Sequence, residues 1–195
     1  MCERQAGKNL GEIKPDHLAR YVWAAKYLVL RANVTRVLDI AAGVGYGSYV
    51  LAESGLVVTA VDIAQEAKAH SGKYFQHKDV TFHVADALDF DTSGFDAIVS
   101  FETIEHLDRD GDFCKKLKAP VVLASVPNQD VLPFNKEDFP EHKRHYTKAD
   151  LDRLFTGKVE YFTQYGKFDH ASVVPALQKD GFQLGRTIVL AEVNV

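Results

Sequence analysis

The stretch that most constrains the fold is RVLDIAAGVGYG at residues 36–47, where a short hydrophobic run meets an acid and then alternating glycines. A continuous apolar run of this kind is typical of a buried parallel strand. Glycine at Gly43, Gly45 and Gly47 allows a close approach to the backbone, and three alternating glycines are more than a turn alone needs. Because ligands of open α/β sheets bind beyond the carboxyl ends of strands, the stretch predicts a strand, a ligand-binding loop and then a helix.

The chain continues as an alternation of Val- and Ile-rich runs with segments of helical spacing. Pro15 and Asp16 open an amphipathic helix, DHLARYVWAAKYLVL. This alternation predicts an α/β doubly wound sheet. The expected strands are 36–40, 56–63, 80–86, 95–101 and 119–127, and the expected helices between them include 45–54 and 64–77.

The last third of the chain has a different pattern. TKADLDRLF at 147–155 predicts a helix with Thr147 as N-cap and Asp150 completing a capping box. The further expected elements are a strand at 158–166, a helix at 171–182 interrupted near Pro175, and a final strand at 185–195.

The length of 195 residues favours one domain, which we place at 15–195 after a loosely ordered segment at 1–14. Residues 126–147 are polar and rich in proline and asparagine. Since loops of this length inside a compact domain usually have a function, we expect a lid and acceptor wall there.

The composition excludes some classes of protein. A net charge of −4 and a pI near 6.0 argue against binding nucleic acid by phosphate neutralisation. The chain begins without the apolar core of a signal peptide and contains no apolar run long enough to span a bilayer. The chain has only two cysteines, Cys2 and Cys114, so we expect no structural disulfide. We expect a cytoplasmic location for the same reason.

Two cofactor classes use a glycine loop between a strand and a helix. A dinucleotide prefers G-x-G-x-x-G, because its pyrophosphate sits on the helix start, whereas this chain has Gly43-x-Gly45-x-x-Ser48. Asp39 would repel a pyrophosphate, but it suits the ammonium and sulfonium of S-adenosylmethionine. Asp62 ends the second strand, where a carboxylate can accept hydrogen bonds from both hydroxyls of a ribose. The loop favours S-adenosylmethionine, with a nicotinamide dinucleotide as the alternative.

From about residue 17 to residue 192, the sequence resembles the class I S-adenosylmethionine-dependent methyltransferases, and in particular the methyltransferase type 11 group. VLDIAAGVGYGS resembles the first motif, with Ala41 where a further glycine is usual. AVDI resembles the ribose-binding segment, HVADALDF the segment near the adenine amine, and FDAIVSFETIEHL the fourth-strand motif. The pair Arg20–Tyr21 resembles the preceding helix, where such residues approach the methionine carboxylate.

The resemblance implies a Rossmann-like sheet of seven mostly parallel strands whose last strand is antiparallel. It also implies that the chain binds S-adenosylmethionine and releases S-adenosylhomocysteine. The implied cofactor contacts are Tyr21, Asp39, Ala41, Gly43, Gly45, Asp62, Ile63, Asp86, Ala87 and Phe101.

Methyl transfer is an in-line displacement at an already activated carbon, so the protein mainly aligns the acceptor and excludes water. A hydroxyl acceptor also needs a base. Glu102, Glu105 and His106 have the spacing of one face of a helical turn, beside the expected methyl group. A second group of polar residues, PEHKRHYT, contains His142 and His145. The candidate catalytic residues are His106, Glu102 and His145.

The pattern E-x-x-E-H with a distant histidine also resembles the 2′-O-methyltransferases that act on the 3′ ends of small RNAs. In those enzymes two acids and two histidines hold a divalent cation, which suits mixed oxygen and nitrogen ligands. We expect a site without metal, and keep this metal set as the alternative. Its ligands would be Glu102, Glu105, His106 and His142 or His145.

The sequence thus predicts O-methylation of a small-molecule or sugar hydroxyl, the sugar by analogy alone. DNA amino-methyltransferases carry Asp/Asn-Pro-Pro-aromatic where this chain has Ser100-Phe101-Glu102-Thr103, so methylation of a base nitrogen is disfavoured. The alternatives are an RNA 3′-end enzyme and a non-catalytic S-adenosylmethionine-binding protein. The expected partner is a small-molecule acceptor, without membrane or nucleic acid; the sequence names neither the acceptor nor the oligomeric state.

Overall fold

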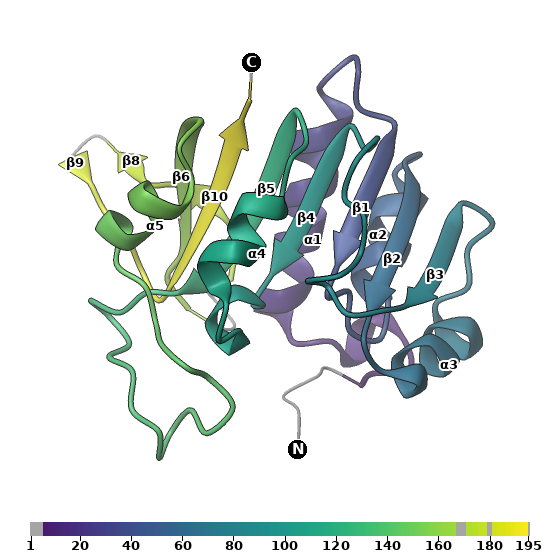
Figure 1. The fold of residues 1–195 in the computed structure, drawn as a ribbon, viewed down its shortest axis with the longest axis horizontal. Helices are drawn as coiled ribbons and strands as arrows, with labels where there is room; N and C mark the ends of the chain where they lie inside the picture. The colour runs from purple at the N-terminus through teal and green to yellow at the C-terminus, as the bar shows by residue number, and fades with distance from the viewer. Residues whose placement is uncertain (1–5, 167–170, 179–180, 195) are drawn as a thin grey trace.

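The computed structural model describes residues 6–166, 171–178 and 181–194, and these form one central sheet with helices on both faces (Figure 1). The strands of this sheet are β1 (Arg36–Ile40), β2 (Val57–Asp62), β3 (Val80–Val84), β4 (Ala97–Phe101), β5 (Val121–Pro127), β6 (Lys158–Gln164), β7 (Val174–Pro175) and β10 (Thr187–Val193). Their order across the sheet is β3-β2-β1-β4-β5-β10-β6-β7.

The sheet has the expected mostly parallel arrangement. Strands β1 to β5 pair in parallel, and the order reverses between β1 and β4. Strand β10 runs antiparallel between β5 and β6, which confirms the prediction of an antiparallel last strand. Two-residue β7 adds an eighth strand at the edge. The reversal beside β1 is the place where α/β sheets of this kind bind ligands.

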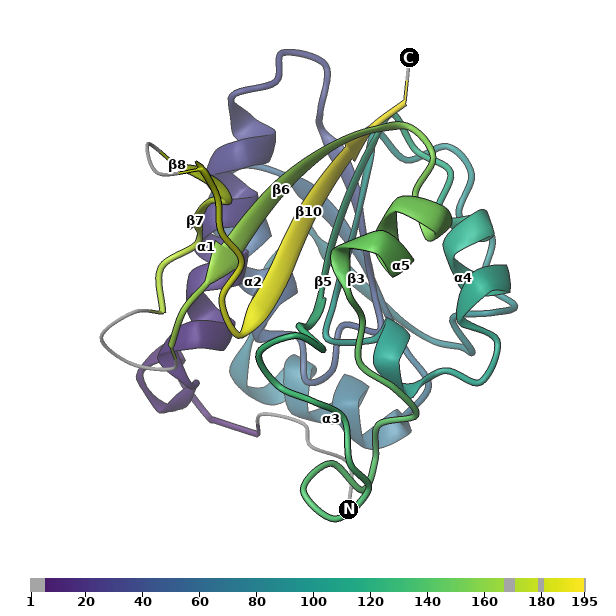
Figure 2. The ribbon, with the colours of Figure 1, turned by 90° about the vertical axis from the view of Figure 1, so that its left-hand side faces the viewer.

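Helices cover the sheet on both sides: α1 (Pro15–Val29), α2 (Tyr46–Glu53), α3 (Gln65–Tyr74), α4 (Asp110–Lys116) and α5 (Lys148–Leu154). Figure 2 shows α1 and α2 on one side and α4 and α5 on the other. Successive strand residues face opposite sides, so the continuous apolar runs fill two cores. Val37 and Leu38 illustrate this, since both are fully buried but belong to different cores.

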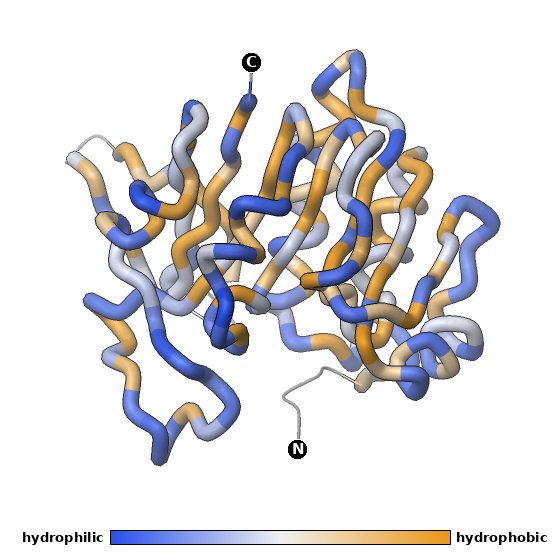
Figure 3. Tube along the Cα trace, viewed as in Figure 1, coloured by the Kyte–Doolittle hydropathy of each residue, from blue (hydrophilic) through white to orange (hydrophobic). Residues whose placement is uncertain are grey.

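The hydrophobic stretches run through the middle strands, whereas the long segment at 128–147 is mostly hydrophilic (Figure 3). This segment lies at the carboxyl ends of the parallel strands, at the bottom of Figure 1. Its two ends are joined where Asn128 bridges Tyr146, and the Asn128 side chain donates to the carbonyl of Gly185, just before β10.

Near the C-terminus the predicted helix at 171–182 is wrong. The described residues form β7 and a separate hairpin of β8 (Leu177–Gln178) and β9 (Gly181–Phe182) instead, while residues 179–180 lie outside the described residues. Pro175 lacks the N–H that a helix interior needs, and the β-branched Val173 and Val174 favour extended backbone. Helix α4 was not expected from the sequence, because its seven residues give only a weak periodic signal.

The two ends of the chain are only partly described. Residues 1–5, including Cys2, lie outside the described residues, but Leu10–Glu12 forms a 3₁₀ turn capped by Asn9, and Ile13 is buried. Cys114 is a buried free thiol. Within the described part, no helix is both long enough and apolar enough to cross a membrane.

Candidate functional site

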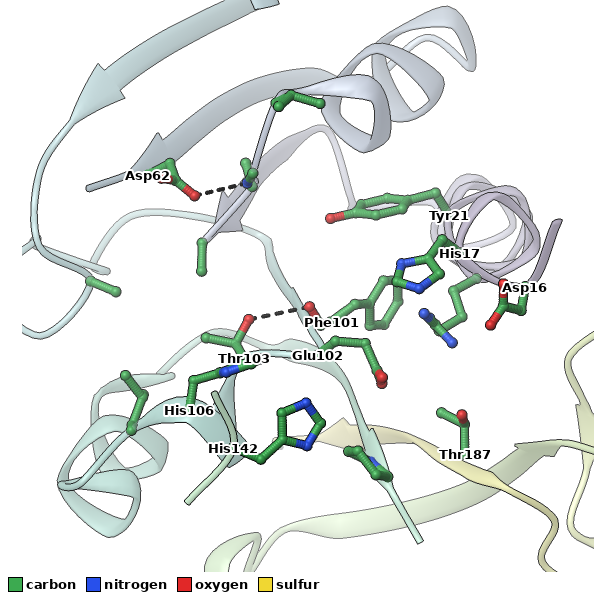
Figure 4. Close-up of a pocket in the computed structure, with 18 of the residues that line it drawn as sticks. Asp16, His17, Tyr21, Asp62, Phe101, Glu102, Thr103, His106, His142 and Thr187 are labelled. Atoms are coloured by element: carbon green, nitrogen blue, oxygen red, sulfur yellow. Dashed lines mark hydrogen bonds between the residues drawn. The ribbon is translucent and has the colours of Figure 1, made fainter. Parts of the chain in front are cut away.

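A cavity of about 390 Å³ opens where the parallel strands end (Figure 4). Several parts of the chain form its wall, among them the start of α1, the loop after β1, the ends of β2 and β4, the residues after β3, the segment at 128–147 and the start of β10. The predicted site residues on this wall are Tyr21, Ala41, Gly43, Asp62, Ile63, Asp86, Ala87, Phe101, Glu102, His106 and His142.

The three glycines of the loop do not all face the ligand site, contrary to the prediction from the sequence. Gly43 lines the cavity with φ +56°, and its N–H donates to the Asp62 carboxylate at 2.9 Å. Gly45 and Gly47 instead face the protein. A Cβ on Gly45 would lie 2.4 Å from the Ser71 hydroxyl oxygen, and one on Gly47 would lie 2.1 Å from the Tyr21 ring. Bare backbone at these two positions is required by neighbouring side chains, and only Gly43 of the three lines the cavity.

Asp39 is also placed behind the loop. It is fully buried, and its carboxylate accepts hydrogen bonds from the Tyr21 hydroxyl at 3.0 Å and the Ser48 hydroxyl at 2.6 Å. Burial raises the pKa of Asp39 to about 6, although these two hydrogen bonds lower it. The carboxylate joins α1 to the start of α2 beneath the loop, and its direct contact with a ligand stays a prediction.

One end of the cavity has the chemistry of a nucleoside site. Asp62 holds the loop through Gly43, and its second oxygen accepts the N–H of Ala64 at 2.9 Å. Beside it, Ile63 presents an apolar side chain that is 64% exposed. Asp86, exposed on the same wall, accepts from the N–H of Leu88. The Asp62 carboxylate thus lies beside the apolar side chain of Ile63, and a nucleoside needs this combination for its ribose and its base.

The other end of the cavity is rich in ionisable groups. Glu102 has φ +50°, and its carboxylate accepts a hydrogen bond from the Ser125 hydroxyl at 2.9 Å. Figure 4 shows it between His17 and His142. Burial alone would raise the pKa of Glu102, but the charge of Arg20 and the Ser125 hydrogen bond outweigh burial and lower it. Glu102 is therefore ionised at neutral pH.

The prediction that Glu102 shares a helical face with Glu105 and His106 is wrong. The 3₁₀ turn Ile104–His106 begins only after Glu102, whose left-handed backbone turns its side chain away from that turn. Glu105, His106 and His142 do come together. One possible ligand atom from each lies within 4.8 Å of the others, so the structure assembles three of the four alternative metal ligands.

His145 lies behind His142. The Nδ1 of His145 faces the Leu132 carbonyl at 2.6 Å, and its Nε2 faces Nδ1 of His142 at 2.8 Å. Because a carbonyl only accepts, His145 carries its proton on Nδ1, and its Nε2 accepts a hydrogen bond from the Nδ1–H of His142. This assignment makes Nε2 of His142 the nitrogen that can take a proton or a metal ion. His145 itself is not on the cavity wall.

The sequence analysis missed several residues on the wall. His17 lies one helical turn before Arg20 and Tyr21, so the i, i+3, i+4 spacing could have revealed it. Burial and the Arg20 charge lower the pKa of His17 to about 4, which keeps it neutral. Arg186 and Thr187 also line the cavity, but no local pattern connects them with α1.

Solved structures with the same fold come from several methyltransferases. The small RNA methyltransferase HEN1 matches with a TM-score of 0.66 and 18% identity over 90% of this chain, which spans only 25% of that chain. The methyltransferase domain of bacterial CtHen1-C matches with a TM-score of 0.67 and 19% identity over 92% of this chain and 100% of that chain.

A third structure is the N-methyltransferase NodS from Bradyrhizobium japonicum WM9, solved with S-adenosylhomocysteine. It matches with a TM-score of 0.68 and 15% identity over 93% of this chain and 88% of that one. No curated protein matches the sequence.

The strand order across the sheet is that of the class I S-adenosylmethionine-dependent methyltransferase fold. Residues 38–119 match the family model described as a methyltransferase domain, the type 11 group, and this match covers the glycine loop, Asp62, Asp86 and β4. The cofactor is therefore S-adenosylmethionine rather than a nicotinamide dinucleotide, and the chain is an enzyme of this class.

Proposed function

We propose that this enzyme transfers the methyl group of S-adenosylmethionine to a hydroxyl oxygen of a small molecule or sugar. The observation that carries the proposal is the hydrogen-bonded series from the Leu132 carbonyl through His145 to His142, which ends on the cavity wall. A hydroxyl holds its proton tightly near neutral pH, so it needs a positioned base, and a neutral histidine supplies one.

Each part of the site then has a role in the transfer. The hydroxyl oxygen forms its bond to the methyl carbon while the carbon–sulfur bond breaks, and the electron pair stays on sulfur as a neutral thioether. The hydroxyl proton passes to Nε2 of His142. His145 fixes the tautomer of His142 and its ring orientation. The ionised Glu102 carboxylate, whose field reaches His142, stabilises the imidazolium that forms.

The series of histidines favours oxygen over nitrogen as acceptor. A neutral amine already presents a lone pair and can lose its proton after transfer, whereas a hydroxyl gains most from proton removal during transfer. NodS is by its description an N-methyltransferase, so the fold alone does not select oxygen, and the choice of acceptor atom depends on the site.

A test uses S-adenosylmethionine with a ¹³C-labelled methyl group and a panel of sugars, polyols and amines. We expect a product whose ¹³C shift is that of an O-methyl group. His142→Asn should lower kcat by a factor of about 10² to 10⁴ while affinity for S-adenosylhomocysteine stays within twofold. The matched control is His83→Asn, an exposed histidine on β3, with wild-type kcat. Labelled N-methyl products alone, or full kcat in His142→Asn, would refute the proposal.

The cluster of Glu105, His106 and His142 supports a second candidate, a metal-dependent methylation of the 2′-hydroxyl at an RNA 3′ end. Ligand atoms about 2.1 Å from one divalent cation lie at most roughly 4.2 Å apart. The three candidate ligand atoms lie within 4.8 Å of one another, so a small side-chain rotation would bring them to that separation. A bound cation would lower the pKa of the acceptor hydroxyl. The RNA acceptor is suggested by the description of HEN1 as a small RNA methyltransferase.

The two candidates differ in acceptor and in metal dependence. RNA oligonucleotides ending in a ribose or a 2′-deoxyribose are compared with sugars, each with Mn²⁺, Mg²⁺ or EDTA. Methylation of the ribose end alone, abolished by EDTA and restored by Mn²⁺, would establish the second candidate. Sugar methylation that survives EDTA would reject it.

A further inference from the structure

The arginines of the described residues differ in how their guanidinium groups are paired. Arg36, Arg109, Arg144 and Arg153 each pair with an aspartate, and Arg31 donates to the Tyr27 carbonyl and lies over the Tyr27 ring. Within the same residues Arg20 and Arg186 form no ion pair, although the chain carries a net negative charge. Both line the cavity.

Arg20 belongs to the cofactor end of the cavity. Its Nη1 donates to Gln164 at 2.7 Å, while its buried Nη2 has no hydrogen-bond partner. Its charge also acts on Glu102 and His17. By the resemblance described above, this side chain approaches the methionine carboxylate of S-adenosylmethionine, which would satisfy Nη2.

Arg186 comes to the cavity from a different element. It directly precedes Thr187 at the start of β10, and Figure 4 shows Thr187 on the same side of the cavity as Asp16 at the start of α1. The half-buried Arg186 side chain forms no hydrogen bond or ion pair within the described part of the chain. Lys14 is exposed on the wall at the N-cap of α1, and it too forms no ion pair with any residue that the structure describes.

We propose that Arg186 and Lys14 bind an anionic group, a carboxylate or a phosphate, on the small-molecule acceptor. This inference rests on the proposed hydroxyl methylation and specifies its substrate class. An arginine presents a planar fork that matches an oxyanion with two hydrogen bonds, and a lysine adds a point charge. The first turn of α1 contributes its own positive end to the same part of the wall.

The acids nearest this subsite do not neutralise Arg186 and Lys14. Of the acids on this end of the wall, Glu102 already accepts a hydrogen bond from Ser125 and lies in the field of the Arg20 charge. Asp16 has one carboxylate oxygen without a hydrogen-bond partner, and it forms no ion pair with Arg186 or Lys14. An uncharged sugar would leave both cations solvated at the mouth, whereas an acidic sugar or hydroxy acid would pair with them.

A binding experiment tests the subsite without catalysis. Protein saturated with S-adenosylhomocysteine is titrated with inorganic phosphate, and separately with malonate, by calorimetry at low ionic strength. We expect millimolar binding that Arg186→Gln weakens about tenfold or more, since a hydrogen bond to a charged group is lost. Arg153→Gln, which removes a surface arginine from an ion pair on α5, is the matched control and should bind as the wild type does.

Three results would overturn the inference: no anion binding to the wild-type complex, equal anion binding by Arg186→Gln, or a large loss of S-adenosylhomocysteine affinity in Arg186→Gln. The last would assign Arg186 to the cofactor. Affinity for S-adenosylhomocysteine is therefore measured first in every variant.

A turnover experiment then identifies the source of the anion. Glucuronate, glucose 6-phosphate and methyl glucoside are compared as acceptors, and we expect one of the charged sugars to have the highest kcat/KM, reduced at least tenfold by Arg186→Gln. Preference for methyl glucoside, or for an RNA end over all three sugars, would reject an anionic small molecule. Anion binding without O-methylation of any acceptor would leave the subsite established and refute the proposed reaction instead.

Discussion

At the scale of single residues, two residues that follow neighbouring strands have a left-handed backbone conformation. Ala41 has φ +61° after β1, and Glu102 has φ +50° after β4. Such a conformation costs a residue with a Cβ about 1–2 kcal/mol, and it is maintained where the surrounding structure requires it. Both residues line the cavity, so the cost lies at the functional site.

Ala41→Gly should stabilise the protein. Glycine removes the left-handed strain, and its larger chain entropy in the unfolded state offsets part of this gain, which leaves about 0.5–1 kcal/mol. Ala42→Gly is the control, because Ala42 is buried without a positive φ and should lose about 1 kcal/mol. Urea denaturation measures both. Equal losses in the two variants would mean that Ala41 is unstrained.

Asp39→Asn should change how stability depends on pH. Burial raises the pKa of folded Asp39 from 3.8 to about 6, so between these values the folded state binds the proton that the unfolded state releases. This group therefore lowers stability as pH rises from 4 to 6, by about 3 kcal/mol in all. The variant has no such cost, and its stability relative to wild type should increase over that range.

Urea denaturation at several pH values between 4 and 7 gives this difference directly. A stability difference between Asp39→Asn and wild type that stays constant across the range would show that Asp39 titrates normally in the folded protein.

At the scale of elements, the contact between α1 and α2 depends on one missing side chain. A Cβ on Gly47 would lie 2.1 Å from the ring of Tyr21, whose hydroxyl binds Asp39. Gly47→Ala should therefore cost about 1–3 kcal/mol, because the ring must move away from its partner. Gly72→Ala in α3, where a Cβ meets nothing within 4 Å, should gain up to about 1 kcal/mol.

Thermal unfolding of the two variants compares alanine in a close contact with alanine in open space. Equal melting temperatures for Gly47→Ala and wild type would show that the Tyr21 ring can shift without loss.

Elements with strong local signals were predictable. The capping box of Thr147 and Asp150 forms as predicted, because both hydrogen bonds lie within four residues. The apolar runs of β1 to β5 were found within about two residues of their ends. The segment at 171–182 was not, since a two-residue strand such as β7 is determined by its pairing with β6 rather than by its own sequence.

At the scale of the whole molecule, the cofactor should stabilise the fold by linking β1, β2 and β4 through the cavity. S-adenosylhomocysteine at 100 times its Kd should raise the free energy of unfolding by about 2.7 kcal/mol. Asp62→Ala should lose most of that gain, through loss of its predicted ribose contacts and of its hold on the Gly43 loop. Asp79→Ala, on the turn before β3, is the control.

The melting temperature with and without the ligand measures this linkage. A wild-type ligand-induced shift in Asp62→Ala would place the ribose elsewhere. An equally reduced shift in Asp79→Ala would assign the effect to general destabilisation.

The sequence by itself determined the alternation of strands and helices, the position of the glycine loop and the cofactor class, because apolar periodicity and turn chemistry act over a few residues. Only the tertiary structure decided which side chains share the cavity wall. His17, Glu102, His142 and Arg186 are far apart in the chain, and they meet because β10 inserts beside β5 while α1 and the segment at 128–147 close over the strand ends. The left-handed turn at Glu102 and the two cavity arginines without carboxylate partners follow from that packing, which no local pattern encodes.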